Sequence, residues 1–305
     1  MIWYSFKPVD TLFFKSAVQA EKGENHEALS IFPPTPHTIA GAIRTTILRQ
    51  NNIAIQDYKK GDIPEKILLT VGKAGSLSPF AVIGTLLKKD NQIYLPTPYH
   101  WFVDKGRNKE QVYQAQPFNS HLIRYENPKK YWVKGADPEL ENIGGKWISM
   151  KNFLNPSKKD IMENESFFRS EIRTGNALTT DKRVHEGRLY SFTHIRLNEN
   201  CEIIYAINKE LPLKEEGILT LGGEQRFGRY AGIRAIDLPQ GDSGLFMALT
   251  MIEANQETEK ALVATGKIIY RGGWDLHIGF HKPMVAYYPA GSVFDQKINE
   301  NMIQL

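Results

Sequence analysis

A segment rich in glycine, arginine and aromatic residues, Leu219–Tyr230, carries side chains suited to holding a nucleic-acid backbone. Its paired glycines, Gly222 and Gly223, can adopt positive φ angles and let another chain come close. Guanidinium groups match phosphate oxygens, and aromatic rings offer faces on which bases stack. The pattern predicts an RNA-binding loop with candidate contacts at Gly222, Gly223, Arg226, Phe227 and Arg229. It is also typical of a glycine-rich hairpin turn whose arginines point into water.

A basic stretch over residues 167–196 is the second candidate for RNA contact. Its six lysines and arginines outnumber its three acidic residues, and it lies between two strand-rich halves of the chain. A groove between two such halves is a natural track for a single strand, so phosphate contacts are expected from Arg173, Thr174, Arg183, His185 and Arg188. The alternative is an exposed linker whose cations are only solvated.

A third candidate is the segment Gly272–Lys282, in which two glycines precede Trp274 and a cation follows at Lys282. Stacking faces, cations and backbone donors at glycines are what single-stranded RNA needs from a protein. Arg44 is a further candidate, because it lies off the apolar face of a predicted helix and near the start of that helix. Trp274, Lys282 and Arg44 are therefore added to the RNA-binding candidates.

Three histidines offer acid–base chemistry, because imidazole titrates near neutral pH. His26 lies in a long polar segment, His37 at a helix start and His185 in the basic stretch. A metal-independent ribonuclease needs a base near a 2′-hydroxyl, a role that His26 or His37 could fill. No spacing ties either residue to a partner, so a solvent-exposed loop residue and a first-turn helix residue are the simpler interpretations.

Several other activities lack their motifs in this sequence. The glycine-rich segment lacks the Lys-Ser/Thr of a phosphate-binding Walker loop, and no His-Glu-x-x-His, Gly-x-Ser-x-Gly or metal-spaced acidic set occurs. The single cysteine, Cys201, excludes an internal disulfide and a cysteine-based zinc site, and it lies within a predicted buried strand. No metal, cofactor or catalytic residue is predicted. The net charge of +4 is compatible with an anionic partner.

The elements expected to position these residues begin with a strand at residues 2–7. Thr35 and Pro36 predict a helix start, and Ile39, Ile43 and Ile47 recur every four residues on one buried face. Gly41 predicts close packing of this helix on a sheet. Residues 66–71, 80–88 and 92–95 are predicted strands. Strand, helix, strand, strand is the opening order of a ferredoxin-like unit.

The second half restarts a strand-rich pattern near Arg188, with few helix signals after Ala206. The sequence therefore predicts an α+β protein of two units, residues 1–165 and 166–305. The first residues lack the pattern of a signal peptide, and no apolar run reaches the length of a membrane span. A cytoplasmic protein without membrane contact is expected.

Several segments together resemble one family, the third subunit of the Cmr (type III-B) CRISPR effector complex, within the Cas5-like group of the RAMP superfamily. The matching segments occur in a specific order and spacing along the chain: Pro8–Phe14, Phe32–Arg44, Ile172–Tyr190, Leu221–Arg226, Gly272–Asp275, Lys282–Pro283 and Pro289–Phe294.

The resemblance implies two tandem ferredoxin-like (RRM-like) RAMP folds with insertions. It further implies a non-catalytic, RNA-binding subunit that caps the complex and holds the 5′ repeat-derived tag of the CRISPR RNA in antiviral defence. The implied protein partners are the large signature subunit with palm domains and the backbone Cmr subunit, which cuts target RNA. The alternative function is a RAMP endoribonuclease that processes guide RNA.

Overall fold

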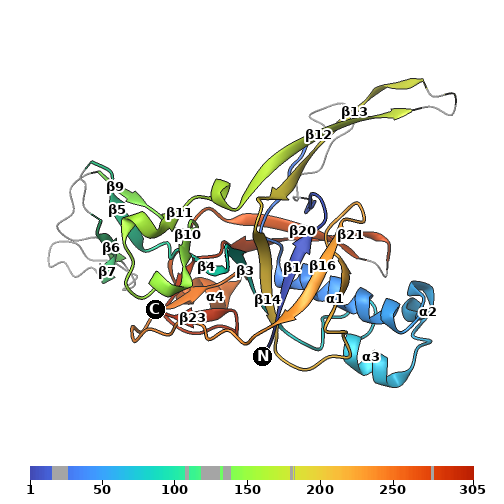
Figure 1. The fold of residues 1–305 in the computed structure, drawn as a ribbon, viewed down its shortest axis with the longest axis horizontal. Coiled ribbons are helices and arrows are strands. Elements are labelled where there is room, and N and C mark those ends of the chain that lie inside the picture. The colour runs from blue at the N-terminus through green and yellow to red at the C-terminus, as the bar shows by residue number, and fades with distance from the viewer. Residues whose placement is uncertain are drawn as a thin grey trace. The chain divides into compact units, whose positions relative to one another are not determined.

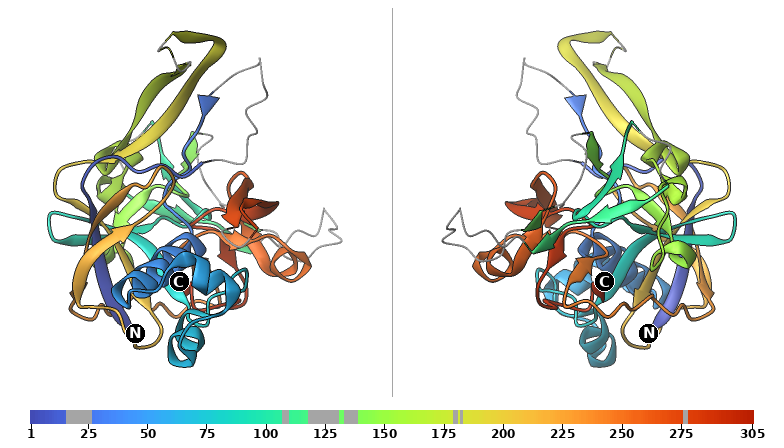
Figure 2. Two further views of the ribbon diagram at one scale, coloured as in Figure 1. Left: turned by 90° about the vertical axis from the view of Figure 1, so that its right-hand side faces the viewer. Right: turned by 90° about the vertical axis from the view of Figure 1, so that its left-hand side faces the viewer.

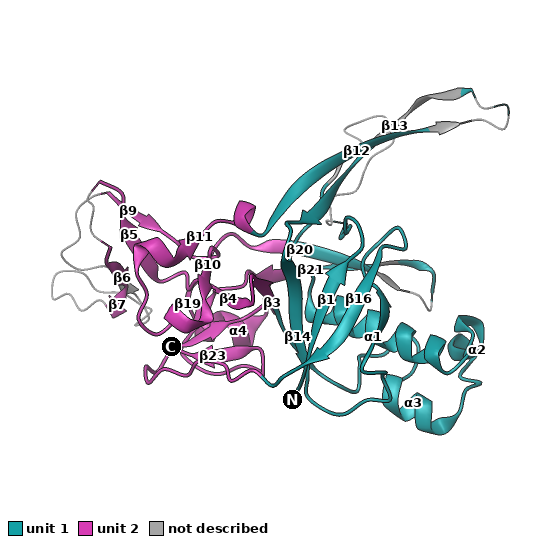
Figure 3. Ribbon diagram, in the orientation of Figure 1, with its two compact units in different colours: residues 1–85, 167–235, 270–284 teal, residues 86–166, 236–269, 285–305 magenta. Residues whose placement is uncertain are grey.

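The computed structural model describes residues 1–15, 27–106, 110–117, 131–132, 139–178, 181, 183–275 and 278–305. Within them only the backbone is described at 27–28, 131–132, 177–178, 184–190, 274–275 and 281. The described part is mixed and strand-rich, which confirms the expected class. It divides into two compact units (Figure 3): unit 1 holds residues 1–85, 167–235 and 270–284, and unit 2 holds residues 86–166, 236–269 and 285–305.

The sheet of unit 1 has strand β1 (Ile2–Pro8) near its centre, as the sequence predicted. β1 pairs antiparallel with β14 (Cys201–Ile207) on one side and with β16 (Phe227–Ile233) on the other. β15 (Glu216–Thr220) continues the sheet beyond β16, and β3 (Val82–Lys89) lies next to β14. Cys201 is buried in β14 as predicted.

Helix α1 (Pro36–Gln50) begins where the sequence predicted, with the Thr35 side chain accepting a hydrogen bond from the backbone of Thr38. The side chains of Ile39, Ile43 and Ile47, on one face of this helix, are fully buried. The prediction for Gly41 was wrong: this glycine is exposed, and an added Cβ would meet nothing within 4 Å. Two short helices follow in the same unit, α2 (Ile55–Lys60) and α3 (Glu65–Val71) (Figure 1).

The predicted strand at residues 66–71 was wrong, because this segment is helix α3. Its buried side chains, Ile67 and Val71, are four residues apart, which is the helical period, while Leu69 between them is 71% exposed. Pro64 precedes the helix, and Gly72 ends it with a positive φ of 76°. The strand was predicted from the apolar content of the segment, which does not distinguish the helical period from that of a strand.

The basic stretch is a long two-stranded β-hairpin in unit 1, formed by β12 (Phe168–Leu178) and β13 (Val184–Leu197). The linker interpretation of this stretch was therefore wrong. The hairpin stands out from the rest of unit 1 in every view (Figures 1 and 2). β2 (Glu27–Ala28) adds two residues parallel to β13. A second hairpin is made by β20 (Ile269–Asp275) and β21 (Phe280–Tyr288), most of which belongs to unit 1.

The described residues of unit 2 form short strands, the α-helix α4 and the 3-10 helices η1, η2 and η3. Its pairings include β4–β10–β11, β6–β5–β9, β7–β8, β19–β22–β17–β23 and β18–β21. Phe294 and Tyr288 lie in its core beside helix α4. The bounds are β4 Gln92–Pro96, β5 Trp101–Asp104, β6 Val112–Gln114, β7 Gln116–Pro117, β8 Tyr131–Trp132, β9 Leu140–Asn142, β10 Trp147–Ser149, η1 Met150–Asn152, η2 Lys158–Asp160, β11 Ile161–Met162, η3 Asn164–Ser166, β17 Phe246–Ala248, β18 Ile252–Glu253, α4 Gln256–Ala261, β19 Leu262–Ala264, β22 Val293–Phe294 and β23 Met302–Gln304.

The two compact units differ from the expected division into residues 1–165 and 166–305. The reason is strand pairing over long sequence separations, since β1 from the first half pairs with β14 and β16 from the second. Among the described residues, no helix has the length and apolar character needed to cross a membrane.

Candidate nucleic-acid interface

Three elements of unit 1 bring a cluster of charged side chains together. The arginine cluster, as we call it, contains Arg173 of β12, Arg196 of β13 and Arg226 of the β15–β16 turn, with Asp10, Glu171 and Glu224 as their carboxylate partners. Asp10 accepts hydrogen bonds from Arg196 Nη2 at 2.9 Å, Arg226 Nη1 at 3.0 Å and Arg173 Nη2 at 3.1 Å. The cluster thus ties the hairpin base to the turn and to the segment after β1.

Strand register places the hairpin members of the cluster. Glu171 pairs with His194 across the hairpin, and Arg169 pairs with Arg196. Glu171 and Arg196 are therefore diagonal neighbours on one face, within reach of each other. Reciprocal backbone hydrogen bonds of 2.8 Å between Leu12 and Ile195 bring the chain after β1 against β13, which places Asp10 beside the arginines.

The glycine-rich segment forms the turn between β15 and β16. Gly222 has a φ of 89°, and a Cβ on it would lie 2.5 Å from the carbonyl oxygen of Phe13. The neighbouring Gly223 N–H donates to that same oxygen at 2.7 Å. The close approach that the glycines permit is thus made to the protein's own backbone. Arg226 leaves this turn and donates to Glu224 at 3.2 Å, so Glu224 helps to orient its guanidinium group.

The electrostatics of the cluster favour the ionised carboxylates of Glu171 and Asp10. Hydrogen bonds from Arg196 and Arg173 lower the pKa of Glu171 from 4.5 to about 2. Partial burial raises the pKa of Asp10, but hydrogen bonds from Arg173 and Arg196 outweigh it and hold that pKa below its usual value. Three positive and three negative groups then balance. Such charge-assisted, multidentate contacts are the stronger kind of hydrogen bond.

His194 closes the cluster from the protein interior. Its side chain is only 1% exposed, Nδ1 lies 3.0 Å from the Thr11 hydroxyl, and Nε2 lies 3.3 Å from Glu224 Oε2. Its ring stacks on Phe13 with centroids 5.2 Å apart. Burial, followed by the charge of Arg226, lowers the pKa of His194, so the ring is neutral near pH 7. Sequence reasoning missed Asp10, Arg196 and His194 as members of this site.

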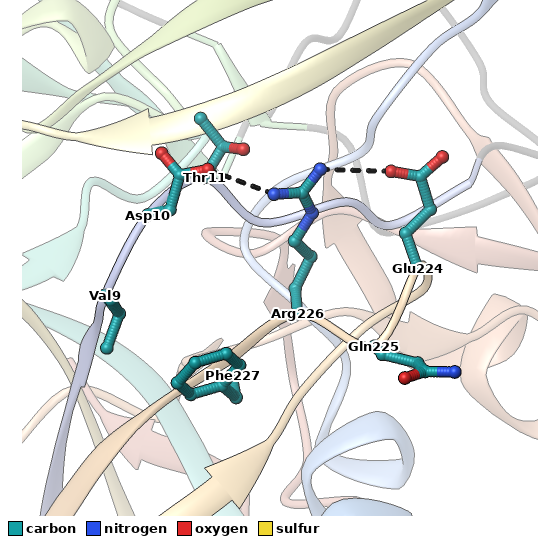
Figure 4. A pocket seen from close by; sticks show the side chains of 7 residues that line it. All are labelled: Val9, Asp10, Thr11, Glu224, Gln225, Arg226 and Phe227. Atoms are coloured by element: carbon teal, nitrogen blue, oxygen red, sulfur yellow. Dashed lines mark hydrogen bonds and ion pairs between the residues drawn. The ribbon is translucent and has the colours of Figure 1, made fainter.

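A small pocket of about 190 Å³ opens beside the cluster (Figure 4). Figure 4 shows the Arg226 guanidinium between Asp10 and Thr11 on one side and Glu224 on the other. Val9 and Phe227 lie further along these two segments of the chain. Phe227 is 46% exposed, and Arg229 lies exposed two residues further along β16. An aromatic face and a guanidinium at one opening are compatible with a nucleotide ligand. The residues that line the pocket are Val9, Asp10, Thr11, Glu224, Gln225, Arg226 and Phe227.

The remaining predicted site residues lie outside the arginine cluster. Arg44 is nine residues into α1, not near its start, and donates to the carbonyl of Lys73 at 2.7 Å, to that of Ser76 at 2.9 Å and to the Tyr58 hydroxyl. That pattern ties α1 to the α3 region. Thr174 is exposed on the hairpin, with its hydroxyl 3.5 Å from that of Ser191.

Arg183 follows the turn of the hairpin, is 85% exposed and forms an ion pair with Asp181 at 3.2 Å. Lys282 is exposed on β21, and Gly272 and Gly273 are exposed on β20. Arg188 and His185 lie on β13 and Trp274 on β20, but their side chains are outside the described residues. His26 is also outside them, and His37 is exposed in the first turn of α1, as expected. Among the described residues, no group of three or more His, Cys, Asp or Glu side chains is arranged so that it could hold a metal ion.

Solved structures with a similar fold include subunits of type III-B CRISPR complexes. A chain in the cryo-EM structure of a type III-B Cmr-beta complex bound to cognate target RNA aligns over 96% of this chain and 86% of its own, at 16% identity and a TM-score of 0.57. A second Cmr-beta structure, with target RNA and AMPPnP, gives 15% identity, 96% and 85% coverage and the same TM-score of 0.57. No curated protein sequence matches the chain.

The decisive comparison is with protein families. Residues 4–305 match the family described as CRISPR-associated protein (Cas_Cmr3). A match over nearly the whole chain, together with a fold like that of Cmr-beta subunits, defines a CRISPR-associated protein. The chain belongs to the Cas_Cmr3 family, which confirms the resemblance seen in the sequence.

Proposed function

We propose that this chain is a non-catalytic, RNA-binding subunit of a type III-B CRISPR effector complex in the cytoplasm. In this role it caps the complex and holds the 5′ repeat-derived tag of the CRISPR RNA. It docks onto the large palm-domain subunit and onto the backbone Cmr subunit. The observation that carries the proposal is the family match over residues 4–305.

The strand order of unit 1 supports the ferredoxin-like part of the proposal. Its first strand β1 is followed by α1, then β3, β14 and finally β16, and these strands lie in the order β3-β14-β1-β16. Numbered along the chain, that order is 2-3-1-4, as in a βαββαβ unit. The second helix of that unit has no counterpart here, since the fully described chain between β14 and β16 contains β15 instead. We propose that unit 1 is one of two ferredoxin-like halves.

The exposed chemistry of unit 1 supports an RNA partner. Arg183, Arg229 and Lys282 are exposed cations on three different strands or turns, and Phe227 offers an exposed ring. Cations that contact phosphate position RNA without reading its sequence, whereas stacked or hydrogen-bonded bases give specificity. A subunit that holds a defined tag needs both kinds of contact.

The test is binding of the purified chain to CRISPR RNA with an intact 5′ tag and to the same RNA with a scrambled tag, over a series of salt concentrations. We expect tighter binding of the tagged RNA and an affinity that falls steeply with salt. Equal affinity for both RNAs contradicts tag recognition. Absence of any salt-dependent binding contradicts RNA contact altogether and leaves a protein scaffold.

The non-catalytic role has a separate test. Alanine at His26, His37 and His185 together should leave target-RNA cleavage by the assembled complex intact. Incubation of the chain with repeat RNA, without metal, should give no defined product. A defined product that disappears in the triple variant favours the guide-processing endoribonuclease instead, with histidine as the base.

A further inference from the structure

The carboxylate of Asp10 occupies a point on which three arginines converge. Its Oδ1 faces Arg196 Nη2 at 2.9 Å, and its Oδ2 faces Arg226 Nη1 at 3.0 Å and Arg173 Nη2 at 3.1 Å. The backbone N–H of Thr11 also donates to Asp10. Forks of guanidinium donors match phosphate oxygens as well as carboxylate oxygens. The point is therefore chemically a site for an oxyanion, and the chain fills it with its own side chain.

Each of the three arginines has a second carboxylate partner besides Asp10. Arg173 donates to Glu171 Oε1 through Nε at 2.9 Å and Nη2 at 2.8 Å, and Arg196 Nε donates to Glu171 Oε2 at 2.5 Å. Arg226 has its own carboxylate in Glu224. Each arginine thus retains a partner when Asp10 moves away, and its remaining donors stay directed at one point.

Asp10 is also the most accessible carboxylate of the cluster. Its side chain is 42% exposed, against 31% for Glu171 and 36% for Glu224. It lines the pocket beside Val9 and Phe227, so a ligand reaches it from the side where an exposed aromatic ring is available. Displacement of Asp10 leaves three cations with two carboxylates at this point, a net charge of +1 that a single phosphodiester neutralises.

We propose that Asp10 is an internal substitute for a backbone phosphate, and that a phosphodiester of single-stranded RNA replaces it between Arg173, Arg196 and Arg226. This inference rests on the proposed RNA-binding function and specifies where one phosphate is held. Any anion that binds the arginines must displace the Asp10 carboxylate, which weakens its binding. A strand that also places a nucleotide beside Phe227 regains affinity in the pocket, so the site is selective for such a strand. Exchange of one anion for another leaves the hairpin base joined to the turn throughout.

The test compares three variants that each remove one negative charge: Asp10→Asn, Glu171→Gln and Glu216→Gln. Glu216 is exposed on β15, outside the cluster, and serves as the matched control. Binding of the full chain to a fluorescent single-stranded RNA is measured from low to high salt. Asp10→Asn should bind severalfold tighter than wild type, with a salt slope steeper by roughly one counterion. Glu171→Gln should bind more weakly, because Arg173 and Arg196 lose their fixed positions.

The proposal is supported if Asp10→Asn strengthens RNA binding and Glu171→Gln weakens it, although both variants remove one negative charge. Asp10→Asn that binds RNA no tighter than wild type overturns it, and so does a gain shared equally with Glu171→Gln or Glu216→Gln, which is a general charge effect. Loss of folded structure in Asp10→Asn also overturns it, since the arginines then depend on Asp10. If wild type and variants all fail to bind RNA, the proposed function fails. The inference about the anion site is then tested separately with inorganic phosphate. At constant ionic strength, phosphate should raise the Tm of Asp10→Asn more than that of wild type, and an equal rise overturns the site.

Discussion

Replacement of Gly222 by alanine tests the packing of the glycine-rich turn most directly. An alanine at φ 89° costs about 1–3 kcal/mol in backbone strain, because this region suits only glycine. Its Cβ would lie 2.5 Å from the Phe13 oxygen, so the turn must move away and the 2.7 Å hydrogen bond from Gly223 is lost. That bond contributes about 1 kcal/mol. Gly222→Ala should therefore destabilise unit 1 by about 2–4 kcal/mol.

The assay is urea unfolding followed by tryptophan fluorescence, because Trp3 lies buried in β1 of the same unit. The matched control is Gly41→Ala, at an exposed position of α1 where a Cβ meets nothing within 4 Å. That change should stabilise the helix by about 0.4–1 kcal/mol. A loss of less than about 0.5 kcal/mol in Gly222→Ala, the range of ordinary surface changes, refutes the close approach of the turn to Phe13.

Three further predictions concern charged residues. Arg226→Ala should weaken guide-RNA binding and reduce its salt slope by roughly one counterion. Arg234→Ala, at an exposed position outside the arginine cluster, serves as the comparison. An unchanged slope for Arg226→Ala contradicts an RNA contact. Arg173→Glu combined with Arg183→Glu should weaken binding of tagged and scrambled guides alike, and a loss confined to the tagged guide means that these residues read bases. Arginine contacts hold the pKa of Glu171 at about 2 rather than 4.5, so its stabilising effect is complete above about pH 4.5 and is lost as the pH falls toward 2. Glu171→Gln should flatten the fall of the urea midpoint over that interval, and a fall as steep as in wild type contradicts the pairing.

Local sequence signals predicted the elements whose partners are close in sequence. Thr35 and Pro36 marked the start of α1. Asp90 and Asn91, both with positive φ, form the turn between the strands predicted at residues 80–88 and 92–95. The failure at residues 66–71 has a physical cause, because a short apolar run fits either a strand or a helix until burial is known. The compact units cross the predicted boundary at residue 165, because β1 pairs with β14 over a separation of about 200 residues.

The candidate site was only partly predictable for the same reason. Gly222, Gly223, Arg173 and Arg226 were predicted as RNA contacts from residue type, and their contact with RNA stays a prediction. The structure brings Arg173 and Arg226 onto Asp10, and both glycines lie in the turn that carries Arg226. Their shared partner Asp10 could not be recognised, since nothing local indicates that a single aspartate will face three arginines from other strands. A signal did exist, because Asp10 lies within a segment, residues 8–14, that resembles the family.

Assembly of each unit from three separate chain segments has a consequence for synthesis of the protein. β1 is made first, yet its partner β14 ends at Ile207 and β16 at Ile233. At roughly 5–20 residues per second, β1 waits about 10–40 s for the first of these partners. Until then its unpaired edges and its apolar residues are available for wrong pairings. A chaperone that shields the nascent N-terminal strand should therefore raise the yield of folded protein, and truncation after residue 165 should leave a fragment that aggregates.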